Sequence, residues 1–123
     1  MARILIVDDD PDIVEAGTLF LEREGHTVSA AYNRPDGMKA VEAFQPDLLI
    51  LDVMMEQPDD GFRMAQDLRR AGHKLPILML TSVATASGLA FGQDAEMVPV
   101  DDFTAKPVEP AELVAKVARL LKA

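Results

Sequence analysis

The sequence contains no cysteine, has few basic residues and has no long apolar run, and each of these features excludes a class of protein. Without cysteine, the chain cannot form disulfides, use a thiol nucleophile or hold a metal through thiolates. Its 12 Lys and Arg residues are scattered and are outnumbered by 21 Asp and Glu, giving a formal net charge of −9. Direct binding to nucleic acid needs clustered basic residues, so we expect none.

The apolar runs are also too short for a signal peptide or a membrane span, because the first one holds four strongly apolar residues before an acidic cluster. Neither G-x-x-x-x-G-K-[ST] nor G-x-G-x-x-G occurs, which argues against nucleotide binding. A chain of 123 residues suits one compact domain. We therefore expect a single domain over residues 1–123 that is soluble, complete and cytoplasmic, without an effector domain and without a membrane partner.

Short apolar runs alternate with stretches of helical periodicity, a pattern typical of an α/β fold with a mostly parallel sheet. The sequence predicts strands over residues 3–7, 27–31, 47–51, 77–80 and 102–105. It predicts a first helix capped by Asp10, starting at Pro11 and stopped by Gly25, and further helices over 35–44, 61–71 and 109–121. The stretch 82–100 lacks an amphipathic period, so a short or irregular helix with long loops is expected there.

Polar and charged side chains follow four of the predicted strands. Asp8 and Asp9 follow the first strand, Asp52 the third, Thr81 the fourth and Lys106 the fifth. The carboxyl ends of parallel strands meet at one edge of the sheet, so these residues are expected to form a single pocket. Two unit charges about 4 Å apart repel by roughly 4 kcal/mol at an effective dielectric near 20, so a hard cation such as Mg²⁺ is needed. One ammonium and one Mg²⁺ would neutralise the three carboxylates.

Each of these residues also has a simpler interpretation. Helix capping explains one aspartate of the first cluster, Asp10, but not its neighbours. Taken alone, Asp52 could be a turn residue, Thr81 an ordinary hydroxyl at a strand end and Lys106 a solvated lysine. Their occurrence together at the ends of four strands favours a site.

The motifs at these strand ends together resemble those of the receiver domains of two-component response regulators, over the whole chain. They are ILIVDDDP at 4–11, DLLILDVMM at 47–55, PILMLTS at 76–82 and FTAKP at 103–107. The resemblance implies an α/β fold with a doubly wound, five-stranded parallel sheet of flavodoxin-like order 2-1-3-4-5 and helices on both faces. It also implies a phosphorylation-dependent signalling switch in a phosphorelay or two-component system.

The resemblance further implies roles for individual residues. Asp52 would be the phosphoacceptor, receiving the phosphoryl group from a histidine kinase or a histidine phosphotransfer protein, with Mg²⁺ as cofactor. The ligands implied for Mg²⁺ are Asp9, Asp52, the backbone carbonyl of Met54 and, through water, Asp8. Thr81 and Lys106 are implied to bind the phosphoryl oxygens. Thr81 and Phe103 are implied to be the switch residues. A cis peptide bond between Lys106 and Pro107 is implied as well.

The chain departs from the family's pattern in the acceptor loop and before the last strand. Glu56 stands where many members have proline, the loop to Gly61 is one residue longer, and Val100-Asp101-Asp102 replaces a motif of small residues and glycine. In the family that the chain resembles, the side chains at the positions of Met54 and Val83 help to orient the hydrolytic water. Both are apolar here, so the resemblance implies slow autodephosphorylation. We expect no enzymatic activity beyond this reaction and the domain's own phosphorylation.

Two other functions stay open at this point. A degenerate receiver would act as a constitutive protein-interaction module, although the full set of predicted site residues argues against it. An aspartyl-phosphate phosphotransferase or phosphatase of the haloacid dehalogenase type would need a second aspartate where this chain has Met54. For the favoured switch, we expect the output to be binding of an unknown downstream protein by a monomer or by a phosphorylation-dependent dimer.

Overall fold

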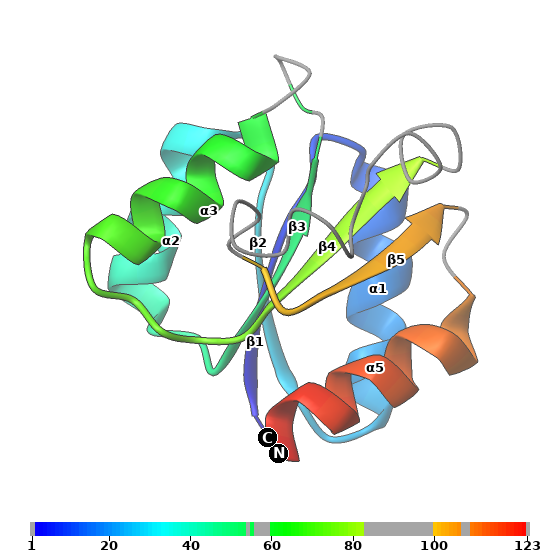
Figure 1. Ribbon diagram of the computed structural model, residues 1–123. Coiled ribbons are helices and arrows are strands. Elements are labelled where there is room, and N and C mark those ends of the chain that lie inside the picture. Colours follow the sequence, from blue (N-terminus) through cyan, green and yellow to red (C-terminus); the bar gives the residue numbers. More distant parts are fainter. Residues whose placement is uncertain (1, 54, 56–59, 83–99, 107–108, 123) are drawn as a thin grey trace.

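The computed structural model describes residues 2–53, 55, 60–82, 100–106 and 109–122, which form three layers with a sheet in the middle (Figure 1). The strands of this part of the chain are β1 (Arg3–Val7), β2 (Thr27–Ala31), β3 (Leu48–Asp52), β4 (Ile77–Ser82) and β5 (Asp102–Lys106). Its helices are α1 (Pro11–Arg23), α2 (Arg34–Phe44), α3 (Asp60–Arg70) and α5 (Pro110–Lys122). Each lies within two residues of its predicted bounds. Residues 83–99, which make up most of the stretch where a short or irregular helix is expected, lie outside the described residues.

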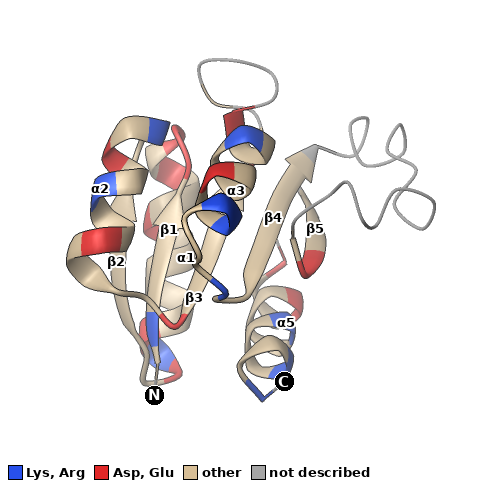
Figure 2. Cartoon of the chain, turned by 60° about the vertical axis from the view of Figure 1, so that its left-hand side comes forward, with Lys and Arg blue, Asp and Glu red and all other residues tan. Residues whose placement is uncertain are grey.

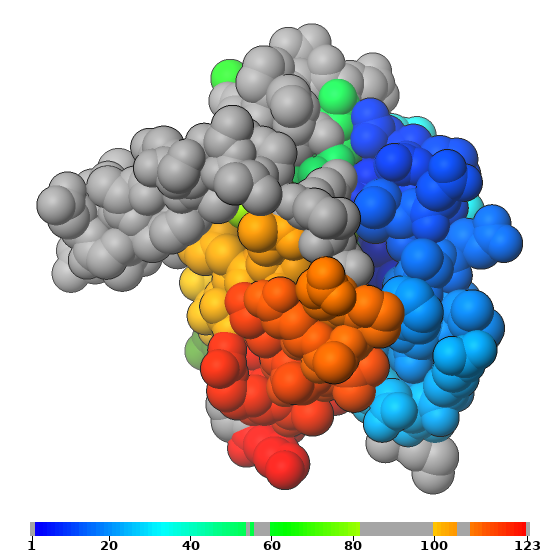
Figure 3. Space-filling view, turned by 90° about the vertical axis from the view of Figure 1, so that its right-hand side faces the viewer, coloured from blue at the N-terminus to red at the C-terminus, as the bar shows by residue number. Residues whose placement is uncertain are grey.

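The five strands form one parallel sheet in the order β2-β1-β3-β4-β5, which confirms the predicted fold class. Helices α2 and α3 cover one face, and α1 and α5 cover the other (Figure 1). Figure 3 shows α5 lying alongside α1. Because both faces are covered, the central strands are apolar without alternation: Ile4–Val7 and Leu48–Leu51 are at most 1% exposed.

The first helix begins and ends as its sequence predicts. The side chain of Asp10 accepts a hydrogen bond from the backbone N–H of Asp12 at 2.9 Å, and Pro11 occupies the first turn. After the helix, Gly25 adopts a φ of 90°, a conformation that glycine reaches without strain. Because only three residues separate β1 from α1, Asp8 and Asp9 in this connection are held at the edge of the sheet.

Two apolar clusters hold the layers together, one on each face of the sheet. Successive strand residues point to opposite faces, so neighbours such as Ile6 and Val7 belong to different clusters. The cluster under α2 and α3 includes Leu5, Val7, Leu49, Leu51, Met64, Leu68 and Met79. The cluster under α1 and α5 includes Ile4, Ile6, Val14, Leu21, Ile50, Leu78, Leu113 and Val117. Packing on both faces fixes the strand ends at which the polar residues lie.

Candidate functional site

The carboxyl edge of the sheet brings the three predicted aspartates together. Val7 of β1 pairs with Leu51 of β3, so the next residues, Asp8 and Asp52, leave the two neighbouring strands at the same level. One carboxylate oxygen from each of Asp8, Asp9 and Asp52 lies within 4.8 Å of the others. The acidic pocket predicted from strand ends is therefore present in the fold.

Two of these carboxylates are removed from water. Asp8 is 0% exposed and Asp52 is 3% exposed, whereas Asp9 is exposed. The Oδ1 atom of Asp8 accepts a hydrogen bond from the backbone N–H of Asp10 at 2.9 Å. Two ionised carboxylates within 4.8 Å repel by roughly 3–4 kcal/mol at an effective dielectric near 20. The arrangement consequently favours a bound cation.

The donor set fits Mg²⁺. It consists of carboxylate oxygens, the ligands that this ion prefers, and Mg²⁺ usually keeps several of its waters. Oxygens on one Mg²⁺ at about 2.1 Å lie roughly 3–4 Å apart, so a cluster with spacings up to 4.8 Å suits a shell in which one carboxylate binds through water. The backbone carbonyl of Met54, implied as a further ligand, lies outside the described residues, as does Val83.

Thr81 and Lys106 lie on the next two strands at the same edge. Asp52 pairs with Leu80, so Thr81 stands one residue further along β4, where it is buried. Lys106 is the last residue of β5 and pairs with Ser82. The side chain of Lys106, Pro107 and the implied cis peptide bond lie outside the described residues. The backbone register thus places the predicted site residues on four neighbouring strand ends.

Phe103 lies further down β5, where it pairs with Met79. Its side chain is half-buried and packs against the cluster under α2 and α3. Its backbone N–H donates to Oδ1 of Asp102 at 2.8 Å, and its carbonyl accepts a hydrogen bond from Nζ of Lys116. In this structure, the side chain of Phe103 is partly exposed on the face of the sheet that α2 and α3 cover, whereas its backbone carbonyl bonds to α5.

The first turn of α3 packs directly against the backbone of Asp52, a contact that the sequence did not predict. The N–H of Gly61 donates to the carbonyl of Val53 at 2.8 Å, and a Cβ atom on Gly61 would lie only 2.1 Å from the carbonyl oxygen of Asp52. The preceding residue, Asp60, is buried and pairs with Arg34 at 3.9 Å. The feature of the sequence that could have indicated this contact is Gly61, a glycine at the first position of the helix predicted over 61–71.

Within the described part of the chain, no helix is both long and apolar enough to span a membrane.

Comparison with known proteins identifies the family. The model of the response regulator receiver domain matches residues 4–118. Over 120 residues the chain is 38% identical to the response regulator MprA of Mycobacterium ulcerans, covering 98% of this chain and 50% of MprA. Over 124 residues it is 37% identical to the DNA-binding dual master transcriptional regulator RpaA of Synechocystis, covering 99% of this chain and 50% of RpaA.

Solved structures give the same result. A two-component response regulator from Clostridium difficile superposes with a TM-score of 0.85 at 26% identity, covering 99% of this chain and 97% of that one. The chain spans about half the length of the curated relatives that it matches, and nearly all of this single solved domain. Because the family model extends over almost the whole sequence, the chain belongs to the response regulator receiver domains, which act as signalling switches rather than enzymes.

Proposed function

We propose that this protein is a phosphorylation-dependent switch in which Asp52 accepts a phosphoryl group from a histidine kinase or a histidine phosphotransfer protein. The observation that carries the proposal is the buried position of the Asp52 carboxylate, within 4.8 Å of the carboxylates of Asp8 and Asp9. Receiver domains bind Mg²⁺ at an acidic pocket and work with histidine kinases. In this chain, Asp8, Asp9 and Asp52 would hold the ion.

The reaction needs little from the protein beyond positioning and charge. An oxygen of Asp52 forms a bond to phosphorus while the P–N bond of the phosphohistidine breaks, and the electron pair leaves with the imidazole nitrogen, which takes up a proton. The pocket already holds two further carboxylates, Asp8 and Asp9, so the incoming phosphoryl oxygens require neutralisation. A bound Mg²⁺ supplies charge neutralisation for these oxygens.

Thr81 and Lys106 are proposed to hold the phosphoryl oxygens. Thr81 is on β4, the neighbour of β3, and Lys106 is on β5, the next strand along; both lie at the edge of the sheet where Asp52 lies. A threonine hydroxyl can donate to the new oxygens, and an ammonium is a compact charge suited to phosphate. Movement of Thr81 toward the acyl phosphate, with repacking of Phe103 on β5, would carry the signal to the surface around β5 and α5.

The output is proposed to be a change in binding to another protein. The relative RpaA is described as DNA-binding, but this chain matches only half of RpaA's length. The net charge of −9 makes the segment itself a poor ligand for nucleic acid. Nucleic-acid contact, where it occurs in a longer regulator, is therefore assigned to a different domain.

The proposal is tested by incubating the protein with Mg²⁺ and a small acyl phosphate and mapping the adduct by mass spectrometry. Asp52→Asn should abolish labelling, whereas Asp12→Asn should leave it unchanged, because Asp12 is exposed in the first turn of α1 and carries the same charge. Removal of Mg²⁺ with a chelator should stop labelling of the parent protein.

Labelling of the Asp52→Asn protein at the parent rate would refute the acceptor assignment. Partner binding that is identical before and after labelling would indicate a constitutive interaction module instead. A parent phosphoryl lifetime of seconds would contradict the slow autodephosphorylation predicted from Met54 and Val83.

A further inference from the structure

A groove between α2 and α3 gathers arginines, although the protein as a whole carries a net charge of −9. Its volume is about 630 Å³, and Figure 2 shows basic positions on both helices. The residues that line it are Arg34 of α2 and Phe62, Arg63, Gln66, Asp67 and Arg70 of α3. Half of the lining residues that the structure describes are cationic and one is acidic, so this described part of the groove is locally positive on an acidic protein.

The guanidinium groups of Arg34 and Arg70 have N–H donors that can bond to a ligand. Arg34 lies 3.9 Å from Oδ1 of Asp60, and Arg70 lies 3.9 Å from Oδ1 of Asp67. Both distances exceed the roughly 2.7–3.2 Å of a hydrogen bond, so these contacts are loose ion pairs that an incoming carboxylate can join or replace. The side chain of Arg70 is 78% exposed and is therefore accessible from solvent.

The spacing of the arginines favours an extended ligand. Arg63 and Arg70 are seven residues apart on α3, so they lie about 10 Å apart along the helix axis. An extended peptide rises about 3.3 Å per residue and covers this distance in roughly three residues. Gln66 lies between the two arginines on the same stretch of helix and can exchange hydrogen bonds with a peptide backbone.

From this arrangement we propose that the α2–α3 groove binds an extended acidic segment of a partner protein, with carboxylates three residues apart placed on Arg63 and Arg70. Single carboxylates match single guanidinium groups bidentately. The open, mostly polar groove lacks the apolar enclosure of a nucleotide pocket. This docking site goes beyond the phosphoacceptor function and does not depend on it.

The proposal is tested with a fluorescent peptide in which glutamates alternate with Ser-Gly pairs, titrated into the full chain. Binding is followed by fluorescence anisotropy at low and at physiological salt, and the contact surface is mapped by NMR of the arginine Nε–H groups and backbone amides. A peptide with glutamine in place of glutamate, inorganic pyrophosphate and single-stranded DNA serve as the other ligands.

The double variant Arg63→Gln/Arg70→Gln should weaken peptide binding about tenfold, because two exposed charge pairs are removed. The matched variant Arg23→Gln/Lys122→Gln removes the same charge from exposed ends of α1 and α5 and should retain most of the affinity. Far-UV circular dichroism verifies that both variants are folded. Equal losses in the two variants would overturn the proposal, since binding would then follow net charge alone.

Two further outcomes would also overturn it. Binding of the glutamine peptide as tightly as the glutamate peptide would exclude carboxylate recognition. Tighter binding of pyrophosphate or DNA, with shifts at the same groove residues, would identify a phosphate site instead. Labelling of Asp52 by an acyl phosphate should proceed equally in the parent and in the Arg63→Gln/Arg70→Gln protein, so failure of the acceptor function and failure of the docking site are distinguishable.

Discussion

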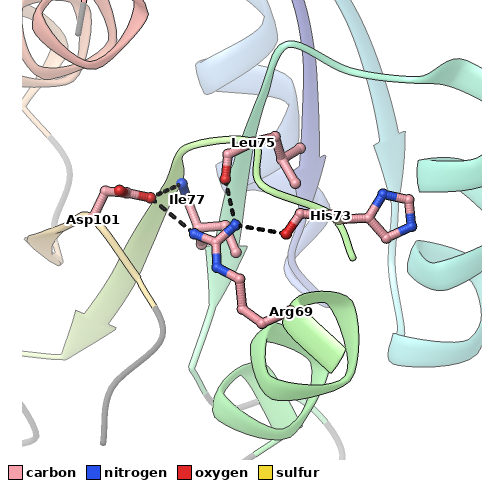
Figure 4. A network of polar contacts seen from close by, with 5 residues as sticks. All are labelled: Arg69, His73, Leu75, Ile77 and Asp101. Atoms are coloured by element: carbon pink, nitrogen blue, oxygen red, sulfur yellow. Dashed lines mark hydrogen bonds and ion pairs between the residues drawn. The ribbon is translucent and has the colours of Figure 1, made fainter. Parts of the chain in front are cut away.

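Arg69 near the end of α3 joins three segments of the chain, and its replacement should destabilise the fold. Figure 4 shows its guanidinium between the loop after α3 and the residue preceding β5. Nη1 donates to the carbonyls of His73 at 3.1 Å and Leu75 at 2.7 Å, and Nη2 donates to Oδ2 of Asp101 at 3.1 Å. The same oxygen of Asp101 accepts the backbone N–H of Ile77 at 2.8 Å.

The expected magnitude follows from these contacts. A hydrogen bond from a charged donor contributes about 1.5 kcal/mol or more, and two such bonds reach backbone carbonyls from Arg69. The ion pair with Asp101 adds at most about 1 kcal/mol, because the Asp101 side chain is 42% exposed. Arg69→Met, which keeps much of the apolar stem, should therefore lower the free energy of unfolding by about 3 kcal/mol. Arg69→Lys should lose roughly half as much, since one ammonium replaces a planar fork.

Urea denaturation followed by far-UV circular dichroism measures this effect, provided that the m-value is unchanged between variants. The neighbouring variant Arg70→Met is the matched control and should change stability by less than about 0.5 kcal/mol, because Arg70 is 78% exposed. A double-mutant cycle with Asp101→Ala should give a coupling energy of up to about 1 kcal/mol. Equal stability of Arg69→Met and Arg70→Met, or strict additivity in the cycle, would refute the reasoning.

Three other perturbations test separate contacts. Gly61→Ala should displace α3 from the acceptor, because the added methyl group would lie 2.1 Å from the carbonyl oxygen of Asp52; loss of stability in urea and of acyl-phosphate labelling would show this, and wild-type values for both would contradict it. Burial lowers the pKa of His26, whose Nδ1 accepts a hydrogen bond from the N–H of Ala2. The contribution of His26 to stability is therefore present above about pH 6.5 and is lost as the pH falls through the folded pKa. His26→Gln should flatten this part of the stability profile, and an unchanged slope would show that His26 is not its cause. Asp9→Asn should weaken Mg²⁺ binding in an NMR titration without loss of folding, since Asp9 is the exposed carboxylate of the cluster, and undiminished affinity would remove it from the ligand set.

The strands and their polar ends could be predicted because their signals are local. An apolar run buried on both faces, followed at once by an acidic residue, identifies β1 with Asp8 and β3 with Asp52 from a few neighbouring letters. Pairing of the two strands then follows from the rules for parallel sheets, and the register of Val7 with Leu51 brings the carboxylates together. The strand order itself came from the family resemblance, since alternating strands and helices leave several orders possible.

The link between Arg69 and Asp101 could not be predicted, because the two residues are far apart in the sequence and each looks like a solvated surface charge. In the sequence, Asp101 differs from its surroundings only as part of the segment that replaces the family's small-residue motif. In the structure, its carboxylate bonds both to the start of β4 and to the end of α3, across 24 and 32 positions of the chain. Long-range polar pairs of this kind carry no periodic pattern, and only the folded backbone brings them within reach.

One helix links the acceptor to both regions that the sequence did not predict. The first turn of α3 rests on Asp52 through Gly61, its exposed face carries Arg63 and Arg70, and its last turn holds Asp101 through Arg69. Because even a Cβ atom at Gly61 has no room, any larger residue at this position requires α3 to move away from the backbone of Asp52. Such a displacement would also move Arg63 and Arg70 relative to Arg34 on α2. The absence of a side chain at Gly61 is therefore what allows α3 to pack against the end of the acceptor strand.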